Sequence, residues 1–241
     1  MATASRPAPA AYRRRLFHSR DAPSDRSGEV WWVQGHRYFC DARFHADAHP
    51  ADAHPADAHP DDDNADGIGG NAFHMGFAGE LVSTDNGTGE VEWVHAITAG
   101  QPFGSADVGR LFEVPGWGLL EAGRDLGYVE LWQRGTDAPG PVWECYGIDP
   151  RGVRAVVVCV GDRFGLALGE DTEAGRPASV HIGSRDGPDC RASHSSWSTP
   201  EPPCFSISPQ PDGGFAVAWR TALNSPEPLY FHPVHQGAQD D

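Results

Sequence analysis

The sequence predicts an all-β fold, an antiparallel barrel or sandwich, on three observations. About a dozen short segments alternate between apolar and polar residues, which is the period of a half-buried strand. Turn-forming residues separate these segments, since the 241-residue chain contains 29 Gly and 21 Pro. No segment of ten residues shows a convincing helical period. Together these features favour many short strands over helices.

The clearest alternation lies in Trp117–Arg134 (WGLLEAGRDLGYVELWQR), where two β-type runs flank a glycine-containing turn. In the second run, Tyr128, Glu130 and Trp132 fall on one face, and aliphatic residues fall on the other. Successive strand residues point to opposite faces, so the aliphatic side packs against a dry core. An aromatic face that carries a carboxylate suits a pocket for a partly polar small molecule.

A second run, EVEWVHAIT at Glu90–Thr98, puts Val91, Trp93, His95 and Ile97 on one face. If the two runs line one inner wall, the candidate site combines ligand-binding aromatic residues with a carboxylate and an imidazole. Burial would then raise the pKa of Glu130 or pair it with His95 or an Arg. The set consists of Trp93, Tyr128 and Trp132 as ligand-binding residues, and Glu130 and His95 as the catalytic acid/base pair.

A purely structural interpretation of these residues stays open. Glu130 could form an ion pair with Arg134 or Arg110, because semi-buried ion pairs are common in barrels. An isolated inward histidine is more often a hydrogen-bonded core residue than a catalyst. The run EVWWVQGHRYFCDARF at 29–44 poses the same choice, since it aligns Arg37, Asp41 and Arg43 on one face. Such a row is a solvent-facing ladder or the lining of a wide barrel.

The strands fall into two sets of similar number, which predicts two barrel-like halves packed together. The first half spans 29–136 and the second spans 142–223, with the break in the turn-rich segment TDAPGP. Residues 1–28 show no sustained period and are expected to form a flexible tail, as is the acidic end at 224–241.

Residues 45–70 form a His/Asp/Pro-rich insertion in the first half, built on three copies of ADAHP. A proline in every unit excludes a helix or a central strand, so we expect a disordered, solvated loop. His49, His54 and His59 could bind Zn²⁺, Ni²⁺ or Cu²⁺ weakly. A dedicated metal site needs a fixed cage of ligands, so we favour an expanded linker and assign no metal ligand.

Charge and cysteine spacing restrict the compartment and the partners. The formal net charge is −16, and all 18 basic residues are Arg. This acidity disfavours nucleic acid and anionic membranes as partners. The five cysteines show no CxxC spacing, the N-terminus lacks the apolar region of a secretory signal, and no run reaches the length of a membrane helix. We therefore expect a cytoplasmic protein with reduced thiols.

Several short motifs resemble proteins of the calycin (lipocalin-like) group, and more narrowly the fungal Hri family of two-part β-barrels. The motifs are Trp31-Trp32, GFAGEL at 76–81, DVGRLFEVPGWGLLEAG at 107–123 and GYVELWQR at 127–134. They cover residues 29–134, and the second half matches only in its strand pattern. The resemblance implies an antiparallel barrel whose mouth holds an apolar or aromatic ligand. It implies no catalytic residue.

The expected function is therefore lipocalin-like binding of a hydrophobic or aromatic small molecule, without a cofactor. One alternative is a cofactor-independent isomerase, cyclase or lyase that uses His95 and Glu130. Another is a protein-interaction scaffold. The chain contains no GxSxG, HExxH, Walker A or dinucleotide-binding motif. Ser193-His194-Ser195 places serine beside histidine, but adjacency in sequence does not indicate a triad. The ligand and the oligomeric state are left open.

Overall fold

A computed structural model describes residues 3–4, 6–20, 22–25, 28–44, 73–84, 89–100, 104–125, 127–135, 140–197, 203–219 and 228–234. Within these ranges every regular element is a β-strand, and the strands form two sheets. Each sheet closes into an eight-stranded antiparallel barrel. The prediction of an all-β protein with two barrel-like halves is confirmed.

The first barrel is built from the N-terminal strands. They are β1 (Thr3–Ala4), β2 (Ala10–Ser19), β3 (Ala22–Asp25), β4 (Glu29–Gln34), β5 (Tyr38–Phe44), β6 (Phe73–Ser83), β7 (Glu90–Gly100), β8 (Asp107–Val114), β9 (Gly118–Gly123) and β10 (Tyr128–Arg134). The order around the barrel is β8-β7-β6-β5-β4-β2-β10-β9, and pairing of β9 with β8 closes it. The short strands β1 and β3 extend the sheet beyond this ring.

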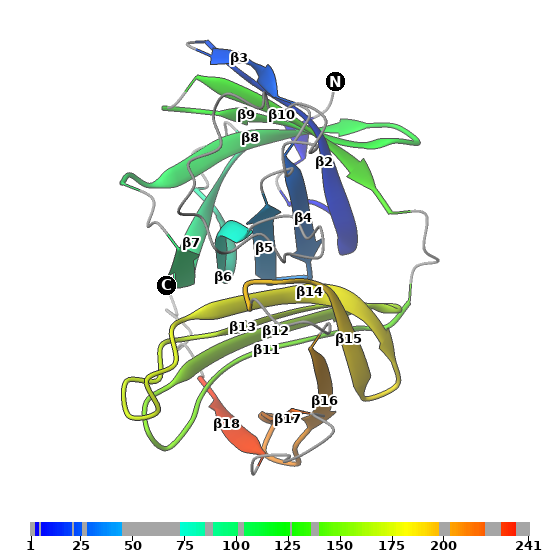
Figure 1. Cartoon of the computed structure of the whole chain (residues 1–241). Helices are drawn as coiled ribbons and strands as arrows, with labels where there is room; N and C mark the ends of the chain where they lie inside the picture. The colour runs from blue at the N-terminus through cyan, green and yellow to red at the C-terminus, as the bar shows by residue number, and fades with distance from the viewer. Residues whose placement is uncertain are drawn as a thin grey trace, which may run out of the picture.

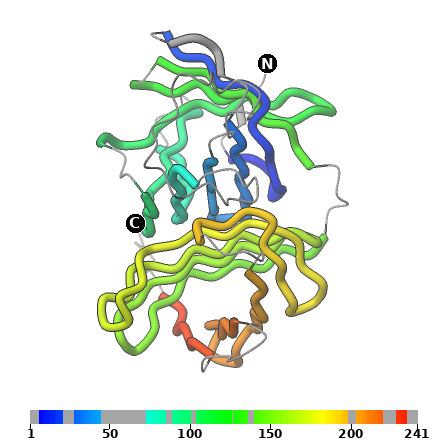
Figure 2. The backbone as a smooth tube through the Cα atoms, viewed as in Figure 1, coloured from blue at the N-terminus to red at the C-terminus, as the bar shows by residue number. Residues whose placement is uncertain are grey.

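The second barrel follows the chain order without crossovers. Its strands are β11 (Val142–Ile148), β12 (Arg154–Val160), β13 (Arg163–Leu168), β14 (Ser179–Asp186), β15 (Asp189–Ser195), β16 (Cys204–Pro209), β17 (Phe215–Trp219) and β18 (Leu229–Pro233). Pairing of β18 with β11 closes the ring. The colour gradient of Figure 2 shows this division, with blue to green in one barrel and yellow-green to red in the other.

The two barrels pack against each other through their outer faces. Strands β12, β13 and β14 lie beneath β4, β5 and β6 (Figure 1). Apolar side chains of both barrels form a shared cluster that includes Val33 and Ala78 of the first and Val156 and Ile182 of the second. Burial of this cluster supplies the hydrophobic contribution that holds the barrels together.

One carboxylate adds a specific polar contact to this interface. Glu144 of β11 accepts hydrogen bonds from the backbone N–H groups of Arg37 at 2.9 Å and Tyr38 at 3.0 Å. A side chain at position 35 would displace this carboxylate, because a Cβ on Gly35 would lie 1.9 Å from Glu144 Oε2. The turn between β4 and β5 is therefore docked onto the second barrel by direct hydrogen bonds.

Each barrel also has its own apolar interior. Inside the first barrel, the buried cluster is dominated by Trp32, Trp93, Trp132, Phe39 and Phe77. The interior of the second barrel is more aliphatic along β12 and β13 and aromatic along β16–β18. The valine-rich run at 153–160 alternates between this interior and the interface between the barrels, which explains why it has no polar face.

Both expected tails are wrong in part. Residues 10–19 form β2, a strand of the first barrel that pairs with β4 and β10. Tyr12 is buried and Arg15 is exposed, so side chains of this strand do differ in burial. The sequence does not reveal this difference, because three consecutive positions are all arginine. At the other end, Leu229–Pro233 forms β18 and closes the second barrel, because Phe231 fills its core.

The expected common face of Val91, Trp93, His95 and Ile97 is also wrong at its last member. A register shift opposite Ala78 and Gly79 makes Ala96 an extra residue in β7. Such a bulge reverses the side-chain alternation. Ile97 consequently belongs to the cluster between the barrels, while Trp93 stays inside.

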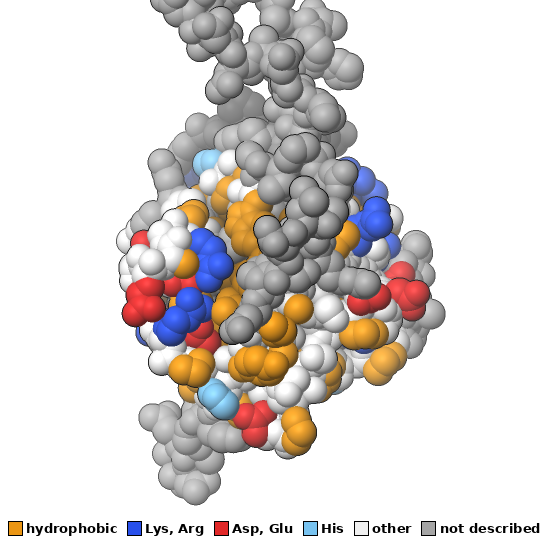
Figure 3. Space-filling view, turned by 60° about the horizontal axis from the view of Figure 1, so that its bottom comes forward, with side chains coloured by type: hydrophobic (Ala, Val, Ile, Leu, Met, Phe, Trp, Pro, Cys, Tyr) orange, Lys and Arg blue, Asp and Glu red, His pale blue; other side chains and the backbone are white. Residues whose placement is uncertain are grey.

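The His/Asp/Pro-rich insertion at 45–70, with His49, His54 and His59, lies outside the described residues. No helix in the described part of the chain has the length and apolarity needed to cross a membrane. On the face shown in Figure 3, apolar side chains gather toward the centre and charged ones lie toward the edges. The large hydrophobic residues that the described surface exposes are Val94 and Tyr230.

Candidate site inside the first barrel

Polar and charged side chains from six strands of the first barrel meet among its buried aromatic residues. We call this set the polar cluster; it consists of Arg14, Asp41, Arg43, His95, Asp107, Glu121, Tyr128 and Glu130. The four carboxyl-bearing residues are between 1% and 7% exposed. Burying so many ionisable groups is costly unless they are paired, so their partners determine what the cluster can do.

Two of the carboxylates are paired with arginines. Arg14 Nη1 donates to Glu130 Oε1 at 2.8 Å, and Arg43 Nε donates to Asp41 Oδ1 at 3.0 Å. Burial raises the pKa of Asp41 to about 6, and the attraction of Arg43 only partly opposes this rise. Asp41 can therefore exchange a proton close to neutral pH.

The other two carboxyl groups are bridged by a tyrosine. The Tyr128 hydroxyl lies 2.7 Å from Glu121 Oε1 and 3.4 Å from Asp107 Oδ1. Trp132 Nε1 donates to the second oxygen of Glu121 at 2.9 Å. Burial, followed by the negative charges of Glu130 and Asp107, raises the pKa of Glu121 well above its ordinary value. This shift favours the protonated form of Glu121, and burial raises the pKa of Tyr128 as well.

His95 is positioned by the bulge in β7. Its ring stacks on Phe77 at a centroid distance of 4.3 Å, and its Nε2 lies 3.3 Å from Asp107 Oδ2. The bulge needs a glycine opposite it, because a Cβ on Gly79 would lie 1.9 Å from the carbonyl oxygen of Val94. Bulges often redirect a side chain next to a functional site.

The structure brings together all five residues that the sequence singles out. Glu130 and Trp132 are buried in the barrel, Tyr128 and His95 take part in the polar cluster, and Trp93 packs edge-on against Trp32 in the same interior. These contacts concern position only, and the roles of the five residues stay predictions.

The ion-pair partner of Glu130 differs from the two arginines expected for the structural interpretation. Arg134 instead contacts Glu113 at 3.4 Å, and Arg110 contacts Glu90 at 3.0 Å. Arg14 is the partner because β2, not a flexible tail, lies beside β10.

Sequence reasoning missed three further members of the cluster. Arg14 lies in the segment that the sequence predicts to be a tail, and Asp107 lies in residues 101–108, whose composition is typical of a loop. The inward direction of the Glu121 side chain could not be predicted, because it depends on the register between β9 and β10. In that register Glu121 pairs with Glu130. The sequence does place Asp41 and Arg43 on one face of their strand. In the structure this face lines the inside of the barrel and is not a solvent-facing ladder.

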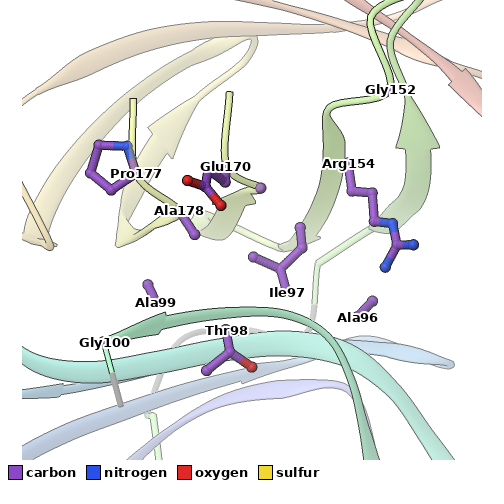
Figure 4. A pocket seen from close by; sticks show the side chains of 11 residues that line it. Ala96, Ile97, Thr98, Ala99, Gly100, Gly152, Arg154, Glu170, Pro177 and Ala178 are labelled. Carbon is purple, nitrogen blue, oxygen red and sulfur yellow. The ribbon is translucent and has the colours of Figure 1, made fainter. Parts of the chain in front are cut away.

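The wall of the barrel is incomplete next to His95. Among the described residues, β7 pairs with β8 only from Glu90 to Trp93, although β7 continues to Gly100. The unpaired part borders a hollow of about 490 Å³ between the barrels. Figure 4 shows Ile97 and Ala99 of β7 on one side of it, with Arg154 and Glu170 of the second barrel opposite.

The interior of the second barrel holds a different kind of polar residue. His181 is fully buried, with Nδ1 2.9 Å from Ser195 Oγ and Nε2 3.2 Å from Ser179 Oγ. Burial lowers the pKa of His181 to about 3, so the ring is neutral. Its ring packs on Trp197 and Phe205, which makes it a hydrogen-bonded core residue.

The described residues contain no group of three or more His, Cys, Asp or Glu side chains arranged to hold a metal ion. Comparisons with protein-family models, curated proteins and solved structures find no match. The chemistry available to the polar cluster is therefore that of its own groups: two ion pairs, a carboxyl group with a raised pKa, and a histidine beside a carboxylate.

Proposed function

We propose that the first barrel is a lipocalin-like binding protein for a small aromatic molecule that carries a positively charged amine. The observation that carries this proposal is the distribution of charge in the polar cluster. Both arginines form ion pairs with Glu130 and Asp41, whereas the remaining carboxyl groups, Asp107 and Glu121, lie beside His95, Tyr128 and Trp132. An ammonium group would supply a counter-charge for Asp107 and a hydrogen-bond donor for Glu121.

The aromatic residues around these carboxyl groups support the same ligand class. Trp93 and Trp132 both pack against Trp32, with centroid distances of 6.0 and 5.4 Å. Aromatic faces attract cations and stack with aromatic rings, so they favour a ligand with both features. A purely apolar ligand would leave the carboxyl groups without a new partner.

We propose that a ligand reaches the cluster through a movement of the barrel wall. Neither of the two hollows of about 490 Å³ lies inside the first barrel. We propose that the ligand enters where β7 lacks a β8 partner, beside His95 and Asp107. The hollow in Figure 4 borders this same segment of β7 and would be the first place that an incoming molecule meets.

Titration of the full chain with matched ligands tests this function. Phenethylamine, 2-phenylethanol and 3-phenylpropanoate share a ring and differ in charge, and binding is measured by tryptophan fluorescence and calorimetry. We expect the amine to bind best and the carboxylate worst. Asp107→Asn should weaken amine binding about 10-fold or more, because a charged hydrogen bond is lost. Glu113→Gln, an exposed carboxylate on β8, is the matched control.

Two outcomes would count against the proposal in different ways. No response to any of the three compounds would remove the binding function. Tighter binding of the carboxylate than of the amine would keep a binding barrel and overturn the ligand class.

A second candidate function is acid/base catalysis by an isomerase, cyclase or lyase with His95 and Glu130. It is favoured by the presence, in one aromatic interior, of the protonated carboxyl group Glu121 and the His95–Asp107 pair. Glu130 would then act through its ion pair with Arg14. If His95→Ala leaves turnover of every candidate substrate unchanged, this alternative fails.

The cysteines support a cytoplasmic location for either function. All five are free thiols, and four of them are buried. Burial raises the pKa of Cys145 to about 11 and that of Cys190 to about 12, which makes both thiols poor nucleophiles. We propose a reducing compartment on this basis.

A further inference from the structure

A second bulge, in β15 of the second barrel, changes the direction of a serine side chain. Ile182 pairs with His194 and Gly183 pairs with Ala192, so Ser193 is an extra residue in its strand. Neighbouring strand residues normally point to opposite faces, but a bulge can bring them to the same side. Only glycine fits opposite, because a Cβ on Gly183 would lie 2.0 Å from the carbonyl oxygen of Arg191.

The bulge brings Ser193 into contact with the histidine that follows it. Ser193 Oγ lies 2.9 Å from His194 Nδ1, and His194 Nε2 lies 3.3 Å from Glu29 Oε2 of the first barrel. The three side chains form a continuous serine–histidine–carboxylate relay. The serine is exposed to solvent, and the other two are half-buried.

Glu29 determines which nitrogen of His194 carries the proton. Burial acts to raise the pKa of Glu29, but His194, Trp31 and Arg13 together lower it, so the group is a carboxylate. A carboxylate accepts hydrogen bonds, so Nε2 must be the protonated nitrogen facing it. Burial lowers the pKa of His194 despite the opposing effect of Glu29, so the ring is neutral at pH 7.

In that tautomer Nδ1 has a free lone pair directed at the serine. The Ser193 hydroxyl then donates to Nδ1, which is the arrangement that activates a serine nucleophile. The same hydroxyl lies 3.3 Å from the carbonyl oxygen of Ile182, a longer contact than the 2.9 Å to the histidine.

The first barrel holds the other two members of the relay in place. The ring of His194 packs against Trp31 at 5.2 Å and Phe44 at 5.3 Å. Glu29 is fixed by Arg13 Nη2 at 3.2 Å and by Trp31 Nε1 at 3.1 Å. A base oriented by a third group, and a third group that is itself held, are the features that distinguish a relay from a chance contact.

We propose that Ser193, His194 and Glu29 form a nucleophilic site at the junction of the two barrels that acts on small carboxylic esters. Ser193 Oγ attacks the ester carbonyl carbon and gives its proton to His194. The bond to the alcohol breaks, and the alcohol leaves with that proton. Water then hydrolyses the acyl-serine and restores the hydroxyl. Ser193 and His194 are the catalytic residues, and Glu29 is a positioning residue.

This site is separate from the interior of the first barrel and does not depend on the proposed ligand there. It does depend on the contact between the barrels, since the nucleophile and base come from one and the carboxylate from the other. Neither barrel on its own contains the complete relay.

A biotinylated fluorophosphonate tests the nucleophile directly on the full chain at pH 7.5. An activated serine forms an Oγ–P bond while the P–F bond breaks, fluoride leaves, and the serine proton passes to the histidine. We expect one label, which peptide mass spectrometry locates on Ser193. Ser193→Ala should remove it, and the exposed Ser184→Ala on the neighbouring strand should not.

Two further variants test the relay. His194→Gln should slow labelling by about 10² to 10⁴, the usual contribution of a positioned base. Glu29→Gln should slow it at least about tenfold. It should also shift the pH profile of labelling to lower pH, because the carboxylate no longer favours protonated His194. Glu29→Asp should restore part of the rate.

Folding of each variant is checked by tryptophan fluorescence and circular dichroism. The proposal is overturned if the folded wild-type chain takes no label on Ser193. It is equally overturned if folded His194→Gln labels at the wild-type rate, because Ser193 would then be an exposed hydroxyl without a base. Hydrolysis of p-nitrophenyl acetate that Ser193→Ala abolishes would support the complete ester reaction.

Discussion

Arg14 and Glu130 form an ion pair of 2.8 Å inside the first barrel, across a sequence separation of 116 residues. The carboxylate is 1% exposed in its side chain and the guanidinium 10%. Such a pair is costly to break from one side, because the remaining charge stays buried without its partner. It therefore links the N-terminal strand to the last strand of the barrel both geometrically and energetically.

Replacement of Arg14 by methionine should lower the free energy of unfolding by about 3–5 kcal/mol. Methionine fills a similar length but leaves Glu130 without its nearest cation. The double variant Arg14→Met/Glu130→Gln should recover part of the loss. The comparison is Arg15→Met, since Arg15 is exposed and its side chain hydrogen-bonds to the neutral Gln133. Urea unfolding measures all three, and equal losses for Arg14→Met and Arg15→Met would contradict the role of the pair.

Asp41 should make the protein less stable as the pH rises from about 4 to about 6. Its pKa is about 6 in the folded protein against 3.8 for an ordinary aspartate, so the folded state binds the proton more tightly. The stabilisation is complete below the unfolded pKa and is lost as the pH rises to the folded one. The shift corresponds to about 3 kcal/mol.

Asp41→Asn isolates this effect because asparagine does not titrate. Urea unfolding of wild type and variant between pH 4.5 and 7.5 should give a steeper decline for the wild type. Identical slopes for the two proteins would show that Asp41 has an ordinary pKa in the folded state.

Glu121→Gln should leave the free energy of unfolding at pH 7.5 unchanged or raise it. Burial raises the pKa of Glu121 and so favours its protonated form, which glutamine resembles in size and in hydrogen bonding. Glu130→Gln, next to it on β10, should instead destabilise the protein, because Arg14 would lose its partner. Thermal unfolding of the two variants gives the comparison, and a large loss for Glu121→Gln would contradict the protonated state.

Gly79→Ala should destabilise the first barrel by roughly 1–3 kcal/mol and displace His95. The new Cβ would lie 1.9 Å from the carbonyl oxygen of Val94 and 2.8 Å from the backbone nitrogen of Ala96, and neither backbone atom can move cheaply. Gly104→Ala is the control, because in the described part of the chain no other atom lies within 4 Å of the added carbon. Unfolding in urea and the NMR signal of the His95 ring report the two effects. A change in neither would show that the bulge tolerates a side chain.

Glu144→Ala should loosen the contact between the barrels. It removes the acceptor of two backbone N–H groups, at a cost of about 1–3 kcal/mol for each unsatisfied group. Hydrogen exchange should accelerate at Arg37 and Tyr38 and leave the second barrel interior protected. Glu173→Ala, an exposed carboxylate in a loop of the second barrel, is the control. Unchanged exchange at both amides would show that other contacts protect the turn.

The sequence predicts the fold and much of the first-barrel site because alternation survives in the strands concerned. Tyr128, Glu130 and Trp132 follow a strict two-residue period, and a strand with that pattern in a closed barrel must direct one face inward. Trp93 and His95 obey the same rule up to the bulge at Ala96. The polar cluster was therefore partly visible before any contact was known.

The rest of the fold and of the two sites depends on the register between paired strands, which no local sequence pattern specifies. A bulge adds one residue without a strong sequence signal, so the direction of Ile97 and the meeting of Ser193 with His194 were both hidden. The inward direction of Arg14 could not be predicted for another reason. Arg13–Arg15 place the same residue type on both faces of the strand, so the sequence does not show which face is buried. Its partner became identifiable only once β2 was seen beside β10.

The position of β2 between β4 and β10 has a consequence for how the chain is made. Residues 10–19 leave the ribosome before the other strands of the closed ring, yet one edge of that strand waits for residues 128–134. Until they emerge, the nascent first barrel is an open sheet with two exposed edges, a state that invites mispairing. Closure of this ring therefore depends on a long-range pairing, and we expect synthesis to be the stage at which the chain is most prone to aggregate.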